Sequence, residues 1–333
     1  MADRRKIRQG QVLSVGSGLR DRYMKFNETR PSSFIYQLGR GGGYCAEMIG
    51  LLKAIQGCAD NDLRLCLGEN RGAKGYAVKN GWGEYFAPFM SVIPGRWLGV
   101  LNDRWRVVDR VPMFRALRSA VLRRMYGNHR YLLDGRAAVD DPMAFADRLG
   151  IAGDWWSVQQ QLIEALWVYQ PDVRGELEAR GEAFGVSEPY VGVHIRRGDK
   201  NTEAPYTALE SYVEILSSSV FRSMPIVLAT DDARVGHQLQ EMLDAGREVR
   251  SLADSGEGHF QTRFNRQDSD VRRQETIRLL FELDMLADSH FFVGAAPSNI
   301  FYWIRYRRGN RGIIDANDAA RMQRVLELVE HRA

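Results

Sequence analysis

Apolar and polar positions alternate in a regular order near the start of the chain. Residues 33–38 (SFIYQL) are rich in β-forming side chains and predict a strand that runs directly into the glycine-rich segment 39–43. Apolar side chains then recur at helical spacing over 46–56, and residues 63–67 (LRLCL) predict a second strand. A strand, a glycine loop and a helix in this order can present main-chain N–H groups to an anion such as a phosphate.

The same alternation returns in the second half of the chain. An amphipathic pattern over 155–180 predicts one long helix. Three apolar runs that each end in polar residues then predict buried strands at 190–195, 225–229 and 291–293. The intervening patterns predict a polar loop at 254–270 and helices at 209–218, 233–245 and 271–287.

This order of elements is typical of an α/β protein with parallel sheets. Because the carboxyl ends of parallel strands meet at one edge, the polar residues after each strand are expected to gather where such sheets bind ligands. Two such halves indicate two Rossmann-like domains that face a cleft. We expect residues 1–185 to form the first domain, 186–310 the second, and 311–333 a C-terminal helix.

Composition excludes several classes of protein. The 333 residues are 44% hydrophobic and 26% charged, which is typical of a globular chain. With 46 Lys+Arg and 42 Asp+Glu the formal net charge is +4, too small a surplus to favour nucleic acid as a partner. The three cysteines, Cys45, Cys58 and Cys66, lack CxxC spacing, which argues against a disulfide framework or a zinc site. No run of about 18 apolar residues predicts a membrane span and no apolar stretch follows the basic first residues, so we expect a cytoplasmic protein.

The most distinctive polar cluster follows the strand predicted at 190–195. It contains a histidine, two arginines, an aspartate and a lysine: His194, Arg196, Arg197, Asp199 and Lys200. Two guanidinium groups at a strand end can clamp a phosphate and stay charged at any working pH. Because alternate residues of a strand point to the same side, His194 and Arg196 should share a face, which favours Arg196 over Arg197 as the phosphate ligand. The alternative is a salt-bridged surface turn.

Carboxylates lie within reach of the same edge. Glu203 beside Lys200 could act as a general base, with the ammonium orienting or relaying the proton; its alternative role is to start a helix. Asp231 and Asp232 could hydrogen-bond a ribose, or one of them could cap the following helix. A metal site is not favoured, because the sequence shows no matching group of His or carboxylate ligands.

Two further segments could contact a diphosphate. Ser298 and Asn299 follow the third strand, where a helix N-terminus offers hydroxyl and main-chain donors; a simple N-cap is the alternative and is compatible with that role. The glycine run at 39–43 matches neither GxGxxG nor the P-loop pattern, so it is a weak signal by itself.

Several segments together resemble the α1,6-fucosyltransferase family. VGVHIRRGDKNTEAPYTALESY at 191–212 is similar to the family signature, ATDD at 229–232 to its second motif, and LADSHFFVGAAPSN at 286–299 to its third. DWWSVQQQLIEALWVYQP at 154–171 is similar to the segment that joins the two halves of the family. RGGGYCAEMIGLLKAI and NGWGEYFAPF resemble its glycine loop and its Gly-Trp-Glu segment. The resemblance extends over about 34–305.

This resemblance implies a GT-B glycosyltransferase that uses GDP-fucose, inverts the anomeric centre and requires neither metal nor cofactor. Residues 1–185 would then lie on the acceptor side and 186–310 would bind GDP-fucose. Glu203 would be the catalytic base with Lys200 close to it, Arg196 would bind the β-phosphate, and Asp199 is the alternative base. The other residues implied to contact the nucleotide are Gly41, Gly42, Gly43, His194, Arg197, Asp231, Asp232, Arg266, Glu282, Asp284, Ser298 and Asn299.

The resemblance leaves some points open. The guanine-reading carboxylate is Glu282 or Asp284, and Arg266 would correspond to an arginine that stacks on the base. An oligosaccharide or glycoconjugate is the expected acceptor. Alternative functions are an α1,2-fucosyltransferase, a GT-B enzyme that uses another nucleotide sugar, and a non-catalytic protein that binds a nucleotide sugar or a polyanion.

Overall fold

A computed structural model describes most of the chain in two compact units. The described residues are 18–38, 43–69, 76, 81–94, 113, 117, 120, 129–131, 143–186, 189–197, 206–243, 246–253, 261–296 and 298–318. Unit 1 comprises Met1–Pro171 and Asn265–Arg273, and unit 2 comprises Asp172–Phe264 and Gln274–Ala333. The domain bounds and the cleft expected from the sequence stay predictions.

Unit 1 is built on a parallel sheet with the strand order β3-β2-β1-β4. Its strands are β1 Ser32–Leu38, β2 Leu63–Glu69, β3 Ser91–Pro94 and β4 His129–Tyr131. Its helices are α2 Tyr44–Asp60, η1 Gly81–Glu84, α5 Ala144–Leu149 and α6 Trp155–Leu166, with a further helix over 18–28. Apolar side chains of β1 and β2, such as Phe34 opposite Leu65, are buried, and α2 packs against both strands.

The prediction of one long helix over 155–180 is wrong, because this segment contains two helices. The chain forms two helices, α6 and α7 Pro171–Phe184, which are separated by residues 167–170. Proline disfavours the α conformation in the residue before it and lacks the N–H group of a helix interior, whereas it is well suited to the first position of a helix. Pro171 is the first residue of α7. The helical spacing of apolar residues continues past this point, although the proline ends the first helix and starts a new one.

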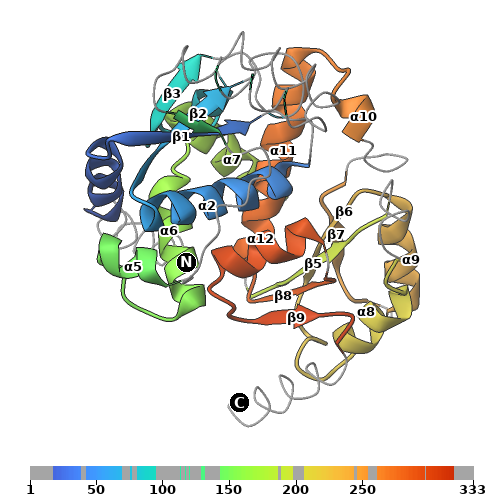
Figure 1. Ribbon diagram of the computed structural model, residues 1–333. Coiled ribbons are helices and arrows are strands. Elements are labelled where there is room, and N and C mark those ends of the chain that lie inside the picture. Colours follow the sequence, from blue (N-terminus) through green and yellow to red (C-terminus); the bar gives the residue numbers. More distant parts are fainter. Residues whose placement is uncertain are drawn as a thin grey trace. The chain divides into compact units, whose positions relative to one another are not determined.

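Unit 2 is built on a second parallel sheet with the order β7-β6-β5-β8-β9 (Figure 1). Its strands are β5 Val191–Ile195, β6 Ile226–Thr230, β7 Val249–Ser251, β8 Phe291–Gly294 and β9 Ile313–Asp315. Its helices are α7, α8 Leu209–Leu216, α9 Arg234–Met242, α10 Gln261–Phe264, α11 Ser269–Asp288 and α12 Asn299–Arg307, although the first turn of α11 belongs to unit 1. The expected α/β fold with two parallel sheets is confirmed.

The two faces of β5 serve different helices. Val191, Val193 and Ile195 belong to an apolar core with α8 and α9, which lie on one side of the sheet in Figure 1. Gly192 points to the other face, where the end of α11 comes so close that a Cβ atom would lie 2.8 Å from Ser289 Oγ. Glycine is therefore required for this close approach of helix and strand. Because His194 follows at alternate spacing, it shares the face of α11 and α12.

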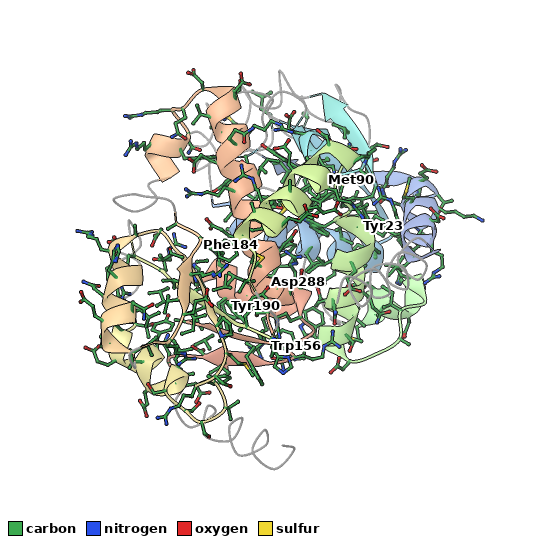
Figure 2. All side chains as sticks on the ribbon, turned by 180° about the vertical axis from the view of Figure 1, so that it is seen from behind. Tyr23, Met90, Trp156, Phe184, Tyr190 and Asp288 are labelled. Carbon is green, nitrogen blue, oxygen red and sulfur yellow. The ribbon has the colours of Figure 1, made fainter. Side chains whose placement is uncertain are left out.

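Polar bonds fix the end of α11 beside the start of β5. Tyr190 donates its phenol hydroxyl to the main-chain carbonyl of Met285 over 2.8 Å, and Figure 2 shows Tyr190 and Asp288 in this region. The guanidinium of Arg308, which is buried, donates to the carbonyls of Ala287 at 2.8 Å and Ser289 at 2.5 Å. These bonds satisfy carbonyls that the helix end leaves without intrahelical partners.

The structure corrects two other expectations of element type. The predicted loop at 254–270 contains the short helix α10 and the first residues of α11. The C-terminal helix expected from 311 does not begin there, because Ile313–Asp315 form β9; residues 319–333 lie outside the described part of the chain. Within the part that the structure describes, no helix has the length and apolarity to cross a membrane. All three cysteines are buried and free.

Candidate functional site

The candidate site lies at the carboxyl edge of the unit 2 sheet, where the strand order reverses direction. β5 pairs with β6 on one side and with β8 on the other, so the chain continues from β5 toward one edge of the sheet, to β6, and from β8 toward the opposite edge, to β9. In open α/β sheets this switch point is where ligands bind, because the loops that follow the two central strands diverge there. Arg196 follows β5, Asp231 follows β6 and Ala295 follows β8.

His194 is the last but one residue of β5 and is only 5% exposed. Burial, and secondly the positive charge of Arg196, lower the pKa of its imidazole to about 3. The histidine is therefore neutral at physiological pH, with one ring nitrogen as a donor and the other as an acceptor. The influence of the Arg196 charge on His194 agrees with the prediction that the two side chains share a face.

The two arginines after β5 differ in their surroundings. Arg197 is engaged in the protein: its guanidinium donates to the Thr207 carbonyl at 3.1 Å and lies 5.0 Å from the centre of the Tyr206 ring. Its main-chain N–H donates to the Asp231 carboxylate over 2.5 Å. Arg197 thus holds the loop that begins after β5, whereas Arg196 is the half-buried cation next to His194. The sequence-based preference for Arg196 as the phosphate ligand stays a prediction, and this geometry is consistent with it.

The two aspartates after β6 also have separate roles. Asp232 accepts a hydrogen bond from the Arg234 main-chain N–H at 3.0 Å, so it caps the first turn of α9. Its carboxylate also binds the Arg234 guanidinium, with distances of 2.9 Å and 2.6 Å to its two oxygens. These hydrogen bonds hold the pKa of Asp232 below its ordinary value. Asp232 is thus largely structural, and Asp231 is the aspartate that reaches the loop after β5.

The segment after β8 leads directly into α12. Ser298 is the N-cap residue of α12, and its hydroxyl oxygen is buried without a hydrogen-bond partner among the described residues. Asn299 is the first residue of the helix and is exposed. The N-terminus of a helix presents main-chain N–H groups and a partial positive charge. An anion at this point would therefore meet both the helix end and the Ser298 hydroxyl.

Residues at the end of β9 hold this segment, although no sequence motif marks them. The Asp315 carboxylate accepts hydrogen bonds from the main-chain N–H groups of Ala296 at 3.2 Å and Asn317 at 3.0 Å. The Asn317 side chain donates to the Ala296 carbonyl at 2.5 Å and accepts from the Thr207 hydroxyl at 2.8 Å. The sequence does contain a signal for Asp315 and Asn317: the apolar pair 313–314 is followed by polar residues, as are the other strands of this sheet.

The two carboxylates considered for guanine lie on α11. Asp284 forms an ion pair with Arg307 in the last turn of α12, with 2.7 Å between oxygen and nitrogen. Glu282 makes a longer ion pair with Arg278, at 3.4 Å, within its own helix. Asp284 is therefore tied to the end of α12 that is opposite to Ser298.

The remaining predicted residues belong to unit 1 or lie outside the described residues. Arg266 is exposed and belongs to unit 1. Gly43 is also in unit 1, as the N-cap residue of α2, where it follows the carboxyl end of β1. The residues that lie outside the described part of the chain are Gly41, Gly42, Asp199, Lys200 and Glu203.

The site in unit 2 thus combines groups suited to a phosphorylated ligand. It has one cation at Arg196, a neutral imidazole at His194, and a hydroxyl with main-chain donors at the start of α12. Such donors stabilise negative charge on phosphate oxygens. Within the described residues, no three His, Cys, Asp or Glu side chains form a group that could hold a metal ion.

Comparison with known proteins agrees with this arrangement. Residues 142–249, which extend from α5 to β7, match the family described as α-(1,6)-fucosyltransferase N- and catalytic domains. This segment contains β5, the arginine pair and both aspartates. The match confirms the family resemblance seen in the motifs and identifies the chain as a glycosyltransferase.

Solved fucosyltransferase structures share the fold. The structure of NodZ α-1,6-fucosyltransferase soaked with GDP-fucose has 15% sequence identity and a TM-score of 0.50, with 83% of this chain and 92% of that chain covered. A mutant of FUT1 from Arabidopsis thaliana in complex with GDP has 11% identity and a TM-score of 0.51, with 90% and 77% covered. At these identities the likeness concerns the fold, which is the GT-B fold expected from the sequence.

Proposed function

We propose that this glycosyltransferase, whose residues 142–249 match the α1,6-fucosyltransferase family, transfers fucose from GDP-fucose to a hydroxyl of an oligosaccharide or glycoconjugate. The observation that carries the proposal is the composition of the switch point in unit 2. Neutral His194 lies near the end of one central strand and Arg196 follows that strand, and the start of α12 with the Ser298 hydroxyl follows its neighbour β8. Both loops therefore present donors to the place where an open α/β sheet binds a nucleotide.

In the proposed reaction the acceptor oxygen forms a bond to C1 of fucose while the bond from C1 to the β-phosphate oxygen breaks. The proton of the acceptor hydroxyl passes to the carboxylate of Glu203, and GDP leaves with the electron pair of the broken bond. Attack from the face opposite the diphosphate inverts the configuration at C1. Lys200 orients the Glu203 carboxylate or relays the proton onward.

The negative charge that develops on GDP requires a stabilising partner. We assign this task to the Arg196 guanidinium and to the donors at the start of α12, with no metal ion in the reaction. Fixed donors of this kind stabilise a developing charge without reorganisation during the reaction. Arginine can also contact two phosphate oxygens at once, which lysine cannot do in the same geometry.

For recognition of the guanine ring we favour Glu282 over Asp284 as the carboxylate that contacts it. Asp284 binds Arg307 at 2.7 Å, at the end of α12 that is opposite to Ser298, whereas the Glu282 ion pair is longer. Exchanging Asp284 for Asn should then leave the preference for GDP over UDP unchanged, and exchanging Glu282 for Gln should reduce it.

Calorimetry in the presence of EDTA tests the donor assignment. GDP, GDP-fucose, GDP-mannose, UDP and UDP-glucose are titrated into the wild type, Arg196→Ala, Arg196→Lys and Arg222→Ala. Arg222 is a matched control because it is exposed and precedes β6, at the opposite edge of the sheet. We expect selective binding of GDP and GDP-fucose, loss of binding in Arg196→Ala, partial loss in Arg196→Lys and unchanged binding in the control.

Other outcomes separate the alternatives. Unchanged GDP affinity in Arg196→Ala would remove Arg196 from the site. Selective binding of UDP-glucose would indicate another nucleotide sugar, and a need for a divalent cation would contradict a metal-free reaction. Binding of GDP-fucose without hydrolysis or transfer in the presence of a panel of oligosaccharides would favour a non-catalytic binding protein.

A further inference from the structure

Asn317 connects two loops of the candidate site that are far apart in the sequence. Its side-chain amide donates to the main-chain carbonyl of Ala296 at 2.5 Å, just before α12. The oxygen of the same amide accepts the Thr207 hydroxyl at 2.8 Å, just before α8. One side chain at the end of β9 therefore holds both the segment after β8 and the segment that returns from β5.

Neighbouring bonds extend this connection across the edge of the sheet. The Thr207 carbonyl accepts a hydrogen bond from the Arg197 guanidinium at 3.1 Å. The main-chain N–H of Arg197 is bound in turn by Asp231 after β6. On the other side, Asp315 accepts the N–H of Ala296, so both main-chain groups of Ala296 are held by the end of β9. The loops after β5, β6 and β8 are thus joined in one series of hydrogen bonds.

We infer that Asn317 is a positioning residue that sets the separation between Arg196 and the start of α12. The inference rests on the proposed function, in which these two elements bind the same diphosphate. Asn317 itself is exposed and is not assigned a contact with substrate. Its effect passes through Thr207 to the loop of the arginines and through Ala296 to Ser298. Small changes in such a separation have large effects on binding and rate, because both groups must contact the ligand together.

A purely structural role for Asn317 would have a different signature. β9 is held in the core independently of it, since Ile314 and Ala316 are buried with the apolar residues of β5 and β8. Hydrogen bonds of an exposed side chain contribute little to folding. Loss of the amide should therefore leave the fold intact and change the placement of the two loops.

The test uses substitutions that remove the two side-chain hydrogen bonds of Asn317 together or remove one of them alone. Asn317→Ala removes both side-chain bonds, Thr207→Val removes the hydroxyl at almost constant volume, and Thr207→Ser restores it. Gln240→Ala is the matched control, because Gln240 is an exposed amide of unit 2 that donates to the Arg247 carbonyl at 2.9 Å, outside the site. GDP affinity is measured by calorimetry, melting temperature by calorimetric scanning, and donor KM and kcat by fucosyl transfer or donor hydrolysis.

We expect Asn317→Ala to weaken GDP binding about tenfold or more and to raise the donor KM while lowering kcat, with a melting temperature within about 2 °C of the wild type. Thr207→Val should act in the same direction, and Thr207→Ser should keep the affinity of the wild type. The double variant Asn317→Ala/Thr207→Val should lose less GDP affinity than the product of the losses in the two single variants. The Gln240→Ala control should bind GDP like the wild type.

Two results would overturn the inference and leave the proposed function in place. One is wild-type GDP affinity and wild-type kinetics in Asn317→Ala. The other is a weakened affinity that is matched by a large fall in melting temperature, which would indicate a structural role. A wild type that binds no guanine nucleotide would instead contradict the proposed function itself.

Discussion

The main-chain N–H of Arg197 donates a hydrogen bond to the carboxylate of Asp231 over 2.5 Å. This bond joins the residue that follows Arg196 on the chain to the loop after the neighbouring strand β6. A charged acceptor makes such a bond stronger than one between neutral groups. The direction in which the chain leaves β5 therefore depends on a carboxylate that the sequence offered only as a ribose contact or a helix cap.

Replacing Asp231 should weaken nucleotide binding through this bond. Asp231→Ala leaves the Arg197 N–H without its acceptor, so we expect GDP affinity to fall about 10- to 100-fold, as for loss of a hydrogen bond to a charged group. Asp231→Asn retains an acceptor oxygen and should lose less. Calorimetric titration with GDP measures both effects. Equal losses in the two variants would contradict a role in which a neutral acceptor oxygen is sufficient.

Removal of the proposed general base should separate binding from transfer. Glu203→Gln keeps the size of the side chain but cannot take the acceptor proton, so transfer should fall by about 10²–10⁴-fold while GDP-fucose affinity is kept. Glu210→Gln is the matched control, because Glu210 is an exposed carboxylate in the first turn of α8. A near-normal transfer rate in Glu203→Gln would move the role of base to Asp199 or elsewhere.

His194 should make the stability of the protein depend on pH. The folded imidazole has a pKa of about 3, whereas a histidine in an unfolded chain titrates near 6.5. Below about pH 6.5 the unfolded state therefore binds a proton that the folded state does not, and stability falls as the pH decreases toward 3. The loss is about 1.4 kcal/mol for each pH unit. This contribution is fully present above about pH 6.5.

Chemical denaturation at pH 7 and pH 5 of the wild type and His194→Gln measures this effect. Because the other titrating groups are common to both proteins, the difference between the two pH dependences isolates His194. We expect the free energy of unfolding of the wild type to fall by about 2 kcal/mol more than that of the variant over this interval. Parallel curves would mean that the imidazole becomes protonated in the folded protein.

Arg308 should be one of the residues most important for the stability of unit 2. Its guanidinium donates to the carbonyls of Ala287, Ser289 and His290, which are buried or partly buried. Because each buried acceptor left unpaired costs about 1–3 kcal/mol, we expect Arg308→Ala to lower the free energy of unfolding by at least about 3 kcal/mol. Arg311→Ala, an exposed arginine of the same turn, should change it by less than about 1 kcal/mol. Denaturant titration measures both, and equal effects would contradict the assignment.

The central strands were predictable because each is a run of mostly apolar residues, which indicates burial on both faces. Residues of β5, β6 and β8 are buried throughout and, apart from His194 and Thr230, apolar, since helices cover both faces of a parallel sheet. The edge strands β3, β4, β7 and β9 were missed. Three or four residues with mixed side chains carry no periodic signal, and their assignment depends on the neighbouring strand that they pair with.

In the candidate site, too, relations between residues close together in the chain could be predicted, whereas contacts between distant residues could not. Alternation along β5 predicts that His194 and Arg196 share a face, and the lowering of the His194 pKa by the Arg196 charge is consistent with this, because the relation depends on residues close together in the chain. Asn317 was not found, because its role depends on Thr207, which is 110 positions away in the chain. The roles of Asp231 and Asp232 were left open for a similar reason: whether a short carboxylate caps a helix or reaches another loop depends on the conformation of the turn.

The composition of unit 1 has a consequence for how the protein is made. Residues Asn265–Arg273 belong to this unit, and Arg273 pairs with Glu84 at 3.0 Å. During synthesis on the ribosome, the amino-terminal part of unit 1 emerges long before this segment is translated. Domains generally fold as they emerge, but unit 1 cannot acquire its last contacts until most of unit 2 has also been synthesised. A nascent chain that stops before Asn265 would therefore expose the surface around Glu84, and unit 1 expressed as a continuous fragment would lack part of its own structure.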